Sequence, residues 1–328
     1  MARSVADLVL IDTALTGDAT VVQPTPAAEI RLGVPREYFW GGIDHEVAKQ
    51  CQTALDKLKA HGVTLVEADM ADIGTVTRAT SPALMLFELY MDFPAYLWET
   101  GAPHSFWDVL AQVKSPDVQA LLKSGKSVTR DQYVKALTAG RPSLMQTYAD
   151  YFRTQNVQAV IFPTVPCTAP LIDPSYSGAL SIEGTPQPGG SMAAFNALIR
   201  NVDPGSCAGL PGLSLPAGLS SNGMPIGLSI DGPAGSDRAL LGLGLTIESI
   251  LGPLAPPPQS WQPSQKDGKY PVDSHLNPRM TGCRLPMPAT VVSAVSNSLT
   301  CFRVPRSASA VRSTTMPAST RCSRMRTC

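Results

Sequence analysis

Apolar and polar residues alternate along the first 256 residues in a pattern that predicts a layered α/β fold. Five short apolar runs have the length of buried strands, and Gly, Pro or Asn closes several of them. Between the runs, apolar residues recur at the three- and four-residue spacing of helices that cover a sheet. Strands linked through helices by short connections are typical of layered α/β proteins. The predicted strands are residues 30–34, 63–66, 157–162, 213–216 and 224–230.

Helix ends are predicted from N-capping residues and from the glycines that close helices. Thr129 and Gln132 have the spacing of a capping box, which predicts that a long helix begins there. Residues 171–192 are rich in Gly, Pro and Ser and are predicted to form a loop. The predicted helical segments run from Ser4 to Gly17, from Asp44 to His61, over 82–155 and over 237–251.

The chain changes character after residue 258. Lys and Arg balance Asp and Glu at 26 each over the whole chain, yet residues 259–328 hold ten basic residues against two Asp. The same segment contains 11 Ser and seven Pro, a composition that buries little apolar surface, so we expect disorder. We therefore divide the chain into a domain over 1–258 and a basic Ser/Arg/Pro-rich tail over 259–328. Translation in a wrong frame or beyond a natural stop would give such a tail.

No motif in the sequence has the residues and spacing of a complete catalytic or metal site. Gly125-Lys126-Ser127 ends like a phosphate-binding loop, but it follows a predicted helix and Ala120 stands where the first Gly belongs. Gly189-Gly190-Ser191 resembles a nucleophile turn, but no base lies nearby in the sequence, so a flexible loop is the simpler interpretation. No His or Cys pair has zinc-site spacing, and we predict neither a metal nor a cofactor.

Several classes of partner and location are disfavoured by the composition. The apolar runs are well short of the ~20 residues that a membrane-spanning helix needs, so no membrane partner is predicted. The tail arginines form no helical stripe, which argues against a nucleic-acid partner. The cysteines of the body, Cys51, Cys167 and Cys207, are scattered and suggest no disulfide framework, so a reducing cytoplasm is the expected location.

Four stretches resemble, in the same order, segments of the amidase-signature family. The first matches the segment that follows the catalytic stretch of that family, and the last matches its Gly/Pro-rich inner segment. The resemblance covers about residues 1–256, and Asp231 to Asp237 favours the aryl-acetamide branch. The four stretches are Met1 to Leu8, Leu32 to Pro35, Phe162 to Pro170 and Asp203 to Gly218.

The resemblance implies a three-layer α/β/α sandwich with a mixed sheet, the amidase-signature fold. It also implies hydrolysis of the carboxamide of a small aryl-acetamide-type substrate to an acid and ammonia. Family enzymes use a Ser nucleophile, a second Ser in a cis peptide and a Lys base, with backbone N–H groups for the oxyanion. All of these precede the segment matched by Met1 to Leu8. We therefore expect an N-terminally truncated, C-terminal portion that lacks the catalytic residues and is inactive alone.

The substrate side of the site is expected after the inner strand and in the Gly/Pro-rich segment. Trp98, Trp107 and Phe195 are candidates for an aromatic wall, although core packing is the commoner role of such side chains. The expected substrate-binding residues are Thr164, Pro166, Cys167, Asp203, Ser206 and Cys207.

Three functions remain open on the sequence. The chain is an inactive amidase remnant, or a non-catalytic module or half of a split enzyme that needs an N-terminal partner, or a nucleic-acid binder that uses its basic tail. The first is favoured, with a small amide as ligand if the enzyme is completed, and a homodimer is compatible with it. Salt-dependent DNA binding that disappears on deletion of residues 259–328 would favour the third.

Limited proteolysis tests the division at residue 258. We expect a protease to trim residues 259–328 before it cuts within 150–250, because a segment without a packed core is cleaved first. Mass spectrometry of the time course identifies the cuts. Equal resistance of the two segments would contradict the predicted disorder.

Overall fold

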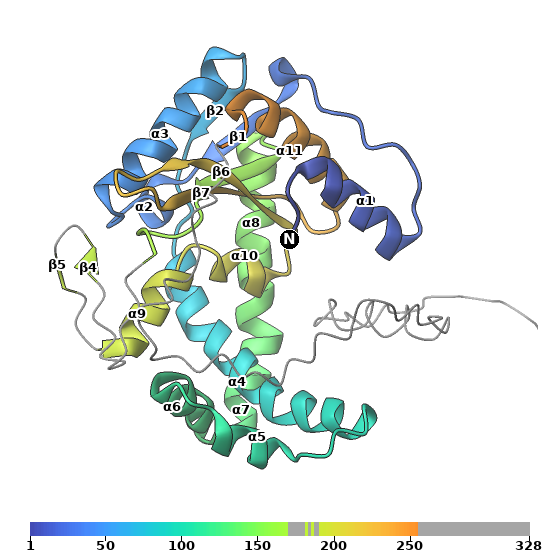
Figure 1. Cartoon of the computed structure of the whole chain (residues 1–328), viewed down its shortest axis with the longest axis vertical. Helices are drawn as coiled ribbons and strands as arrows, with labels where there is room; N and C mark the ends of the chain where they lie inside the picture. Colours follow the sequence, from blue (N-terminus) through green and yellow to red (C-terminus); the bar gives the residue numbers. More distant parts are fainter. Residues whose placement is uncertain (170–180, 183–184, 187–189, 255–328) are drawn as a thin grey trace, which may run out of the picture. The chain divides into compact units, whose positions relative to one another are not determined.

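A computed structural model of the chain describes residues 1–169, 181–182, 185–186 and 190–254 (Figure 1). The strands are β1 (Arg31–Val34), β2 (Thr64–Glu67), β3 (Ala159–Pro163), β4 (Ser181–Ile182), β5 (Thr185–Pro186), β6 (Gly212–Leu219) and β7 (Pro225–Asp231). The α-helices are α1 (Val5–Thr16), α2 (Arg36–Phe39), α3 (His45–Ala60), α4 (Ile73–Glu99), α5 (Phe106–Gln112), α6 (Pro116–Ser124), α7 (Arg130–Lys135), α8 (Arg141–Gln155), α9 (Gly190–Ile199), α10 (Asp203–Ala208) and α11 (Asp237–Leu251). Two 3₁₀ turns, η1 (Ala27–Glu29) and η2 (Gly125–Ser127), and one π-helix, η3 (Ala136–Gly140), complete the described elements.

Five strands form one mixed sheet in the order β2-β1-β3-β7-β6. The β2, β1 and β3 strands pair in parallel, and β3, β7 and β6 pair antiparallel, so the sheet changes direction at β3. All five predicted strands are confirmed, and the observed boundaries differ from the predicted ones by at most a few residues.

Helices cover both faces of this sheet. On one face, α3 and α11 pack against the strands, and α1 packs on α11. On the other face, α8 lies against the sheet with α4 and α10 beside it. Side chains of β3 alternate between the two cores, with Ala159 and Ile161 in the first and Val160 and Phe162 in the second. The predicted three-layer α/β/α sandwich with a mixed sheet is therefore confirmed.

Capping residues place α1 and α3 as predicted. Ser4 Oγ accepts a hydrogen bond from Asp7 N at 3.1 Å, and α1 ends at Gly17, whose φ of 74° favours glycine. Asp44 Oδ1 accepts from Glu46 N at 2.9 Å at the start of α3. The inner face of α3 consists of its five buried residues, Val47, Cys51, Ala54, Leu55 and Leu58.

The helical region differs from prediction in two places. Helix α4 begins at Ile73, earlier than the predicted start at residue 82, because Pro82 lies inside the helix instead of opening it. The capping box of Thr129 and Gln132 is confirmed, but α7 and α8 are joined by the π-helix η3 within the predicted long helix. In Figure 1, α4 and α8 run next to each other from the sheet toward α5, α6 and α7.

The loop predicted over 171–192 is wrong at its described residues. Residues 181–182 and 185–186 pair as the short strands β4 and β5, and α9 already begins at Gly190. A further helix, α10, lies in the Gly/Pro-rich segment, where Pro204 occupies its first turn and Gly209 ends it with a φ of 75°. The predictions for 170–180, 183–184, 187–189 and 255–328, including the tail, lie outside the described residues.

The close approach of α8 to β1 generates a stability prediction. A Cβ on Gly33 would lie 2.5 Å from Tyr151 Cε1, so the α8 ring occupies the space of a side chain on β1. We expect Gly33→Ala to lower the free energy of unfolding by about 1–3 kcal/mol through overpacking. Urea denaturation of the two proteins measures the loss. In a Tyr151→Leu background the same substitution should cost clearly less, and an equal cost in both backgrounds would contradict the proposed steric contact.

Candidate functional site

Three hydroxyl groups meet where β3 ends. Thr164 N donates to Gly227 O at 3.0 Å, which continues the pairing of β3 with β7 by one residue. Thr164 Oγ1 lies 2.6 Å from Ser214 Oγ on β6 and 2.8 Å from Ser229 Oγ on β7. None of these three hydroxyls forms a hydrogen bond with a Lys or His of the described residues. The hydroxyl cluster can hold a polar ligand group, but it lacks a base that would activate a nucleophile.

Helix α10 carries the predicted residues Asp203, Ser206 and Cys207. It packs on the side of the sheet that bears this hydroxyl cluster, which we call the polar face. Asp203 Oδ1 accepts a 2.6 Å hydrogen bond from Ser81 Oγ of α4, and burial raises the pKa of the Asp203 carboxyl. Ser206 is exposed, whereas Cys207 is buried, and burial raises the pKa of its thiol to about 11. A neutral thiol is a weak nucleophile, so the chemistry of Cys207 at neutral pH is that of a small apolar side chain.

Asp231 is a buried carboxylate that sequence reasoning missed as a site residue. It ends β7 on the same face as Ser229, and only 7% of the residue is exposed. A Cβ on Gly205 of α10 or on Gly212 of β6 would collide with the carboxylate oxygens, so both backbones lie against it. Desolvation raises the pKa of Asp231 to about 7. The signal in the sequence is a lone acid that closes an apolar strand and precedes Gly232.

A second buried polar group lies on the α8 side of this carboxylate. Tyr148 is fully buried, and its hydroxyl has no hydrogen-bond partner among the described residues. Burial, followed by the charge of Asp231, raises the pKa of the Tyr148 phenol well above its ordinary value. Arg141 at the start of α8 donates from Nε to Cys207 O at 3.1 Å, which ties α8 to α10. The face therefore combines polar groups with apolar packing, as ligand sites do.

Pro166 and Cys167 lie in a different part of the structure, next to the start of α3. Pro166 O accepts from Asp44 N at 2.7 Å, and Cys167 is buried, with the pKa of its thiol raised chiefly by desolvation and then by Asp44. Nearby, burial lowers the pKa of the Arg200 guanidinium, and its Nη2 has no hydrogen-bond partner in the described part of the chain.

Asn201 connects the end of β3 to the chain just before α10. This fully buried residue donates from Nδ2 to Pro163 O at 2.7 Å and to Phe39 O at 2.9 Å. One side chain thus fixes the end of β3 to the segment between α9 and α10. Thr164, Asp203 and Cys207 thus lie on the side of the sheet that α8 and α10 cover, whereas Pro166 and Cys167 lie near Arg200. Ser206, on the same short helix as Cys207, is exposed to solvent.

The aromatic wall stays a prediction. Trp98 is 87% exposed and Trp107 is 52% exposed, and Lys126 Nζ lies 4.4 Å from the Trp107 ring centroid. Phe195 is half-buried on α9. Gly125-Lys126-Ser127 forms a 3₁₀ turn after α6. Gly190 and Ser191 open α9, in place of the predicted flexible loop, and Gly189 lies outside the described residues.

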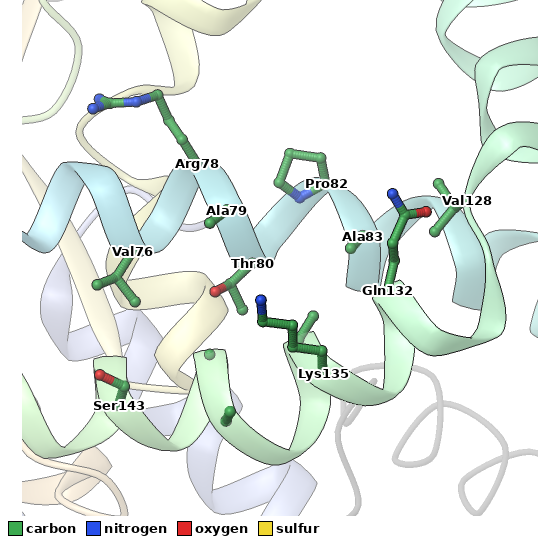
Figure 2. Close-up of a pocket in the computed structure, with 13 residues that line it drawn as sticks. Val76, Arg78, Ala79, Thr80, Pro82, Ala83, Val128, Gln132, Lys135 and Ser143 are labelled. Carbon is green, nitrogen blue, oxygen red and sulfur yellow. The ribbon is translucent and has the colours of Figure 1, made fainter.

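A cavity of about 600 Å³ lies between α4 and the α7–η3–α8 helices (Figure 2). We call it the α4–η3 groove and define it by Thr80 and Ala83 of α4 and by Lys135, Ala136 and Gly140 opposite. None of the six predicted substrate-binding residues lines it. The groove is therefore separate from the polar face around Asp231.

The described ranges contain neither a cluster of metal ligands nor a membrane-spanning helix. Among these residues, no group of three or more His, Cys, Asp or Glu is arranged to hold a metal ion. No helix among them is long and apolar enough to cross a membrane.

Comparison with known proteins identifies relatives. The family model described as Amidase matches residues 1–241. The chain is 35% identical over 254 residues to an indoleacetamide hydrolase of Agrobacterium vitis, covering 76% of this chain and 53% of that protein. It is 37% identical over 266 residues to a mandelamide hydrolase of Pseudomonas putida, covering 77% and 49%. A crystal structure of an amidase aligns with a TM-score of 0.60 at 26% identity, covering 76% and 52%. The chain thus spans about half the length of the curated relatives it matches.

The burial of Asp231 generates a pH prediction. The pKa of its carboxyl is about 7 in the folded protein and about 3.8 when unfolded, so the folded state favours the protonated acid. The stability from this group is complete below the unfolded pKa and is lost as the pH rises through 7. Asp231→Asn keeps the shape without the charge. We expect it to gain about 2–3 kcal/mol of unfolding free energy relative to the parent chain between about pH 5 and pH 8.

Urea unfolding of both proteins at the two pH values measures this difference. Asp56→Asn, at an exposed position on α3, controls for the loss of one acidic residue elsewhere. A constant difference between Asp231→Asn and the parent across the range would contradict the buried neutral carboxyl.

Proposed function

Because this chain belongs to the amidase family, we propose that it forms the substrate-holding half of an amidase. The reaction is hydrolysis of the carboxamide of a small aryl-acetamide-type compound to an acid and ammonia. The observation that carries the proposal is the polar face on which Thr164, Ser229, Asp231 and α10 converge. The face offers ligand groups without an activated nucleophile, as expected for the part of an amidase site that binds and does not attack.

The substrate class rests on the relatives. Indoleacetamide and mandelamide each carry an aromatic group on a short carbon chain that ends in a primary amide. The chain is 35% and 37% identical to hydrolases that bear these names. We extend the shared chemistry, an aromatic group next to a carboxamide, to this chain, and we assign no single amide.

In this proposal the predicted residues have different tasks. Thr164 and Ser206 offer hydroxyl groups to the polar part of the substrate, and Cys207 offers a small apolar surface. Asp203 holds α10 against α4 through Ser81 and so acts as a positioning residue. Pro166 and Cys167 shape the wall near Arg200. Asp231, between Gly205 and Gly212, fixes the distance between α10 and β6.

The attacking groups come from elsewhere in the completed enzyme. Amide cleavage needs a nucleophile, a base that takes its proton and preorganised donors for the oxyanion. The family's Ser, Ser and Lys have no counterpart at the positions of this chain that resemble the family. We therefore propose that a polypeptide segment outside the matched residues supplies them.

Exposed apolar residues favour half of an enzyme that packs against a second polypeptide segment over an independent binding module. On α1, Leu10 is 69% exposed, Ile11 is 42% exposed and Leu15 is 41% exposed, and only Val5 is buried. Apolar side chains gathered on one surface helix are typical of a face that another element covers. A complementary half that packs on α1 would remove them from water.

Restoring the other half tests the function. The chain alone should release no measurable ammonia from indole-3-acetamide or mandelamide, because loss of a catalytic unit costs on the order of 10⁶ in rate in a comparable hydrolase. Fusion to the part of the Agrobacterium vitis indoleacetamide hydrolase that lies outside the matched region should restore turnover. A coupled ammonia assay measures both.

The control is the part of the Agrobacterium vitis hydrolase used in the fusion, expressed without this chain, and it should be inactive. Within the active fusion, Thr164→Val should raise KM more than it lowers kcat, because the proposed contact binds the substrate and takes no part in proton transfer. Turnover by the chain alone, abolished by Ser191→Ala, would overturn the proposal and place a nucleophile on α9.

A further inference from the structure

Two helices approach each other closely in the α4–η3 groove because their facing residues are small. Ala83 of α4 lies opposite Ala136 and Gly140 of η3. A Cβ on Gly140 would collide with Thr80 Oγ1, so only glycine permits this spacing. A cavity of about 600 Å³ adjoins this contact, within the usual range for sites that hold small organic molecules.

Thr80 places an unused hydroxyl in this groove. Only 1% of the residue is exposed, and it lines the groove. No described residue forms a hydrogen bond with Thr80 Oγ1, although Thr77, one turn earlier, bonds its own helix at 2.7 Å through Ile73 O. A ligand oxygen placed against this hydroxyl would supply it with a hydrogen-bond partner.

Lys135 adds a positive charge to the same space. Figure 2 shows the Lys135 and Thr80 side chains extending into the space between the two helices, whereas Arg78 points away from it. Lys135 forms no ion pair with a carboxylate in the described ranges, and no Asp or Glu lines the groove. Cationic lysine and a neutral hydroxyl together are suited to a carboxylate, which accepts hydrogen bonds from both.

The backbone around the groove is irregular on both sides. Pro82 lacks the N–H that would pair with Arg78 O within α4, so the regular hydrogen bond is missing from one turn of this helix. Across the groove, η3 is a π-helix, an element that occurs frequently at functional sites. Both departures from regular helix occur in the lining of one cavity.

We propose that the α4–η3 groove binds a small apolar organic acid, with the carboxylate on Lys135 Nζ and Thr80 Oγ1. The apolar part of the ligand lies against Val76, Val128 and Ala83. This site is separate from the polar face around Asp231, and the inference does not depend on the proposed amidase function.

Calorimetric titration of the full chain with phenylacetate tests the site. Phenylacetate combines an aromatic ring with one carboxylate, and phenylacetamide is its uncharged match. We expect phenylacetate to bind at millimolar concentrations or below, and phenylacetamide to bind at least about fivefold more weakly, because a charge-assisted contact is lost. Equal binding of the two compounds, or no binding of phenylacetate, would overturn the proposal.

Three variants locate the ligand. Thr80→Val keeps the buried shape without the hydroxyl, and Lys135→Gln removes the charge at an exposed position, so both should fold. Each should weaken phenylacetate binding by about three- to tenfold. Lys57→Gln, on α3 and outside the groove, is the matched control and should leave binding unchanged.

Undiminished binding in both Thr80→Val and Lys135→Gln would place the ligand elsewhere and refute the assignment. Absent binding combined with self-association that Lys135→Gln weakens would assign the groove to a second copy of the chain and would equally refute it. Circular dichroism of each variant verifies that the fold is retained.

Discussion

Strand β3 is buried on both of its faces, and the rest of the described structure depends on this constraint. Its residues Ala159 to Phe162 are fully buried, in strict alternation between two cores. A shift of one residue would exchange the side chains of the two cores, so the register cannot slide. Along its two edges, β3 pairs in parallel with β1 and antiparallel with β7.

The register of β3 also determines which polar side chains lie together on the polar face. Asp231 pairs with Val160, Ser229 pairs with Phe162, and Thr164 follows β3 directly. The two-residue period of a strand places these polar groups on the same side. Asn201 then fixes α10 relative to β3 through the carbonyl of Pro163. A buried carboxyl and an unpaired phenol on this face reduce stability, and function is the usual reason for retaining such groups.

The sequence predicts the sheet well because each buried strand is a short run of apolar residues, which can be recognised without knowledge of the distant contacts. Apolar runs of strand length identified β1, β2, β3, β6 and β7, and cap residues identified α1 and α3. The family resemblance, confirmed by the match over residues 1–241, supplied the layer arrangement. Local pattern and tertiary packing agree in these elements.

Elements decided by distant contacts escaped prediction. Helix α10 lies among Gly and Pro residues that favour turns, and packing against α4 and α8 outweighs that preference. The importance of Asp231 depends on Gly205 and Gly212, which no local pattern relates to it. The substrate-binding role of Thr164, Pro166, Cys167, Asp203, Ser206 and Cys207 came from resemblance and stays a prediction.

The π-helix η3 has a consequence for how the chain tolerates change in length. A π-turn holds one residue more than the α-helical turn it replaces, so the extra residue is taken up within a single turn. Removing one residue from Ala136–Gly140 would restore a continuous α-helix without rotating α7 relative to α8. Leu144 and Tyr148 would keep their places in the core, and Lys135 would stay beside the groove. At this one turn the chain can therefore lose a residue while the helices on either side keep their orientation.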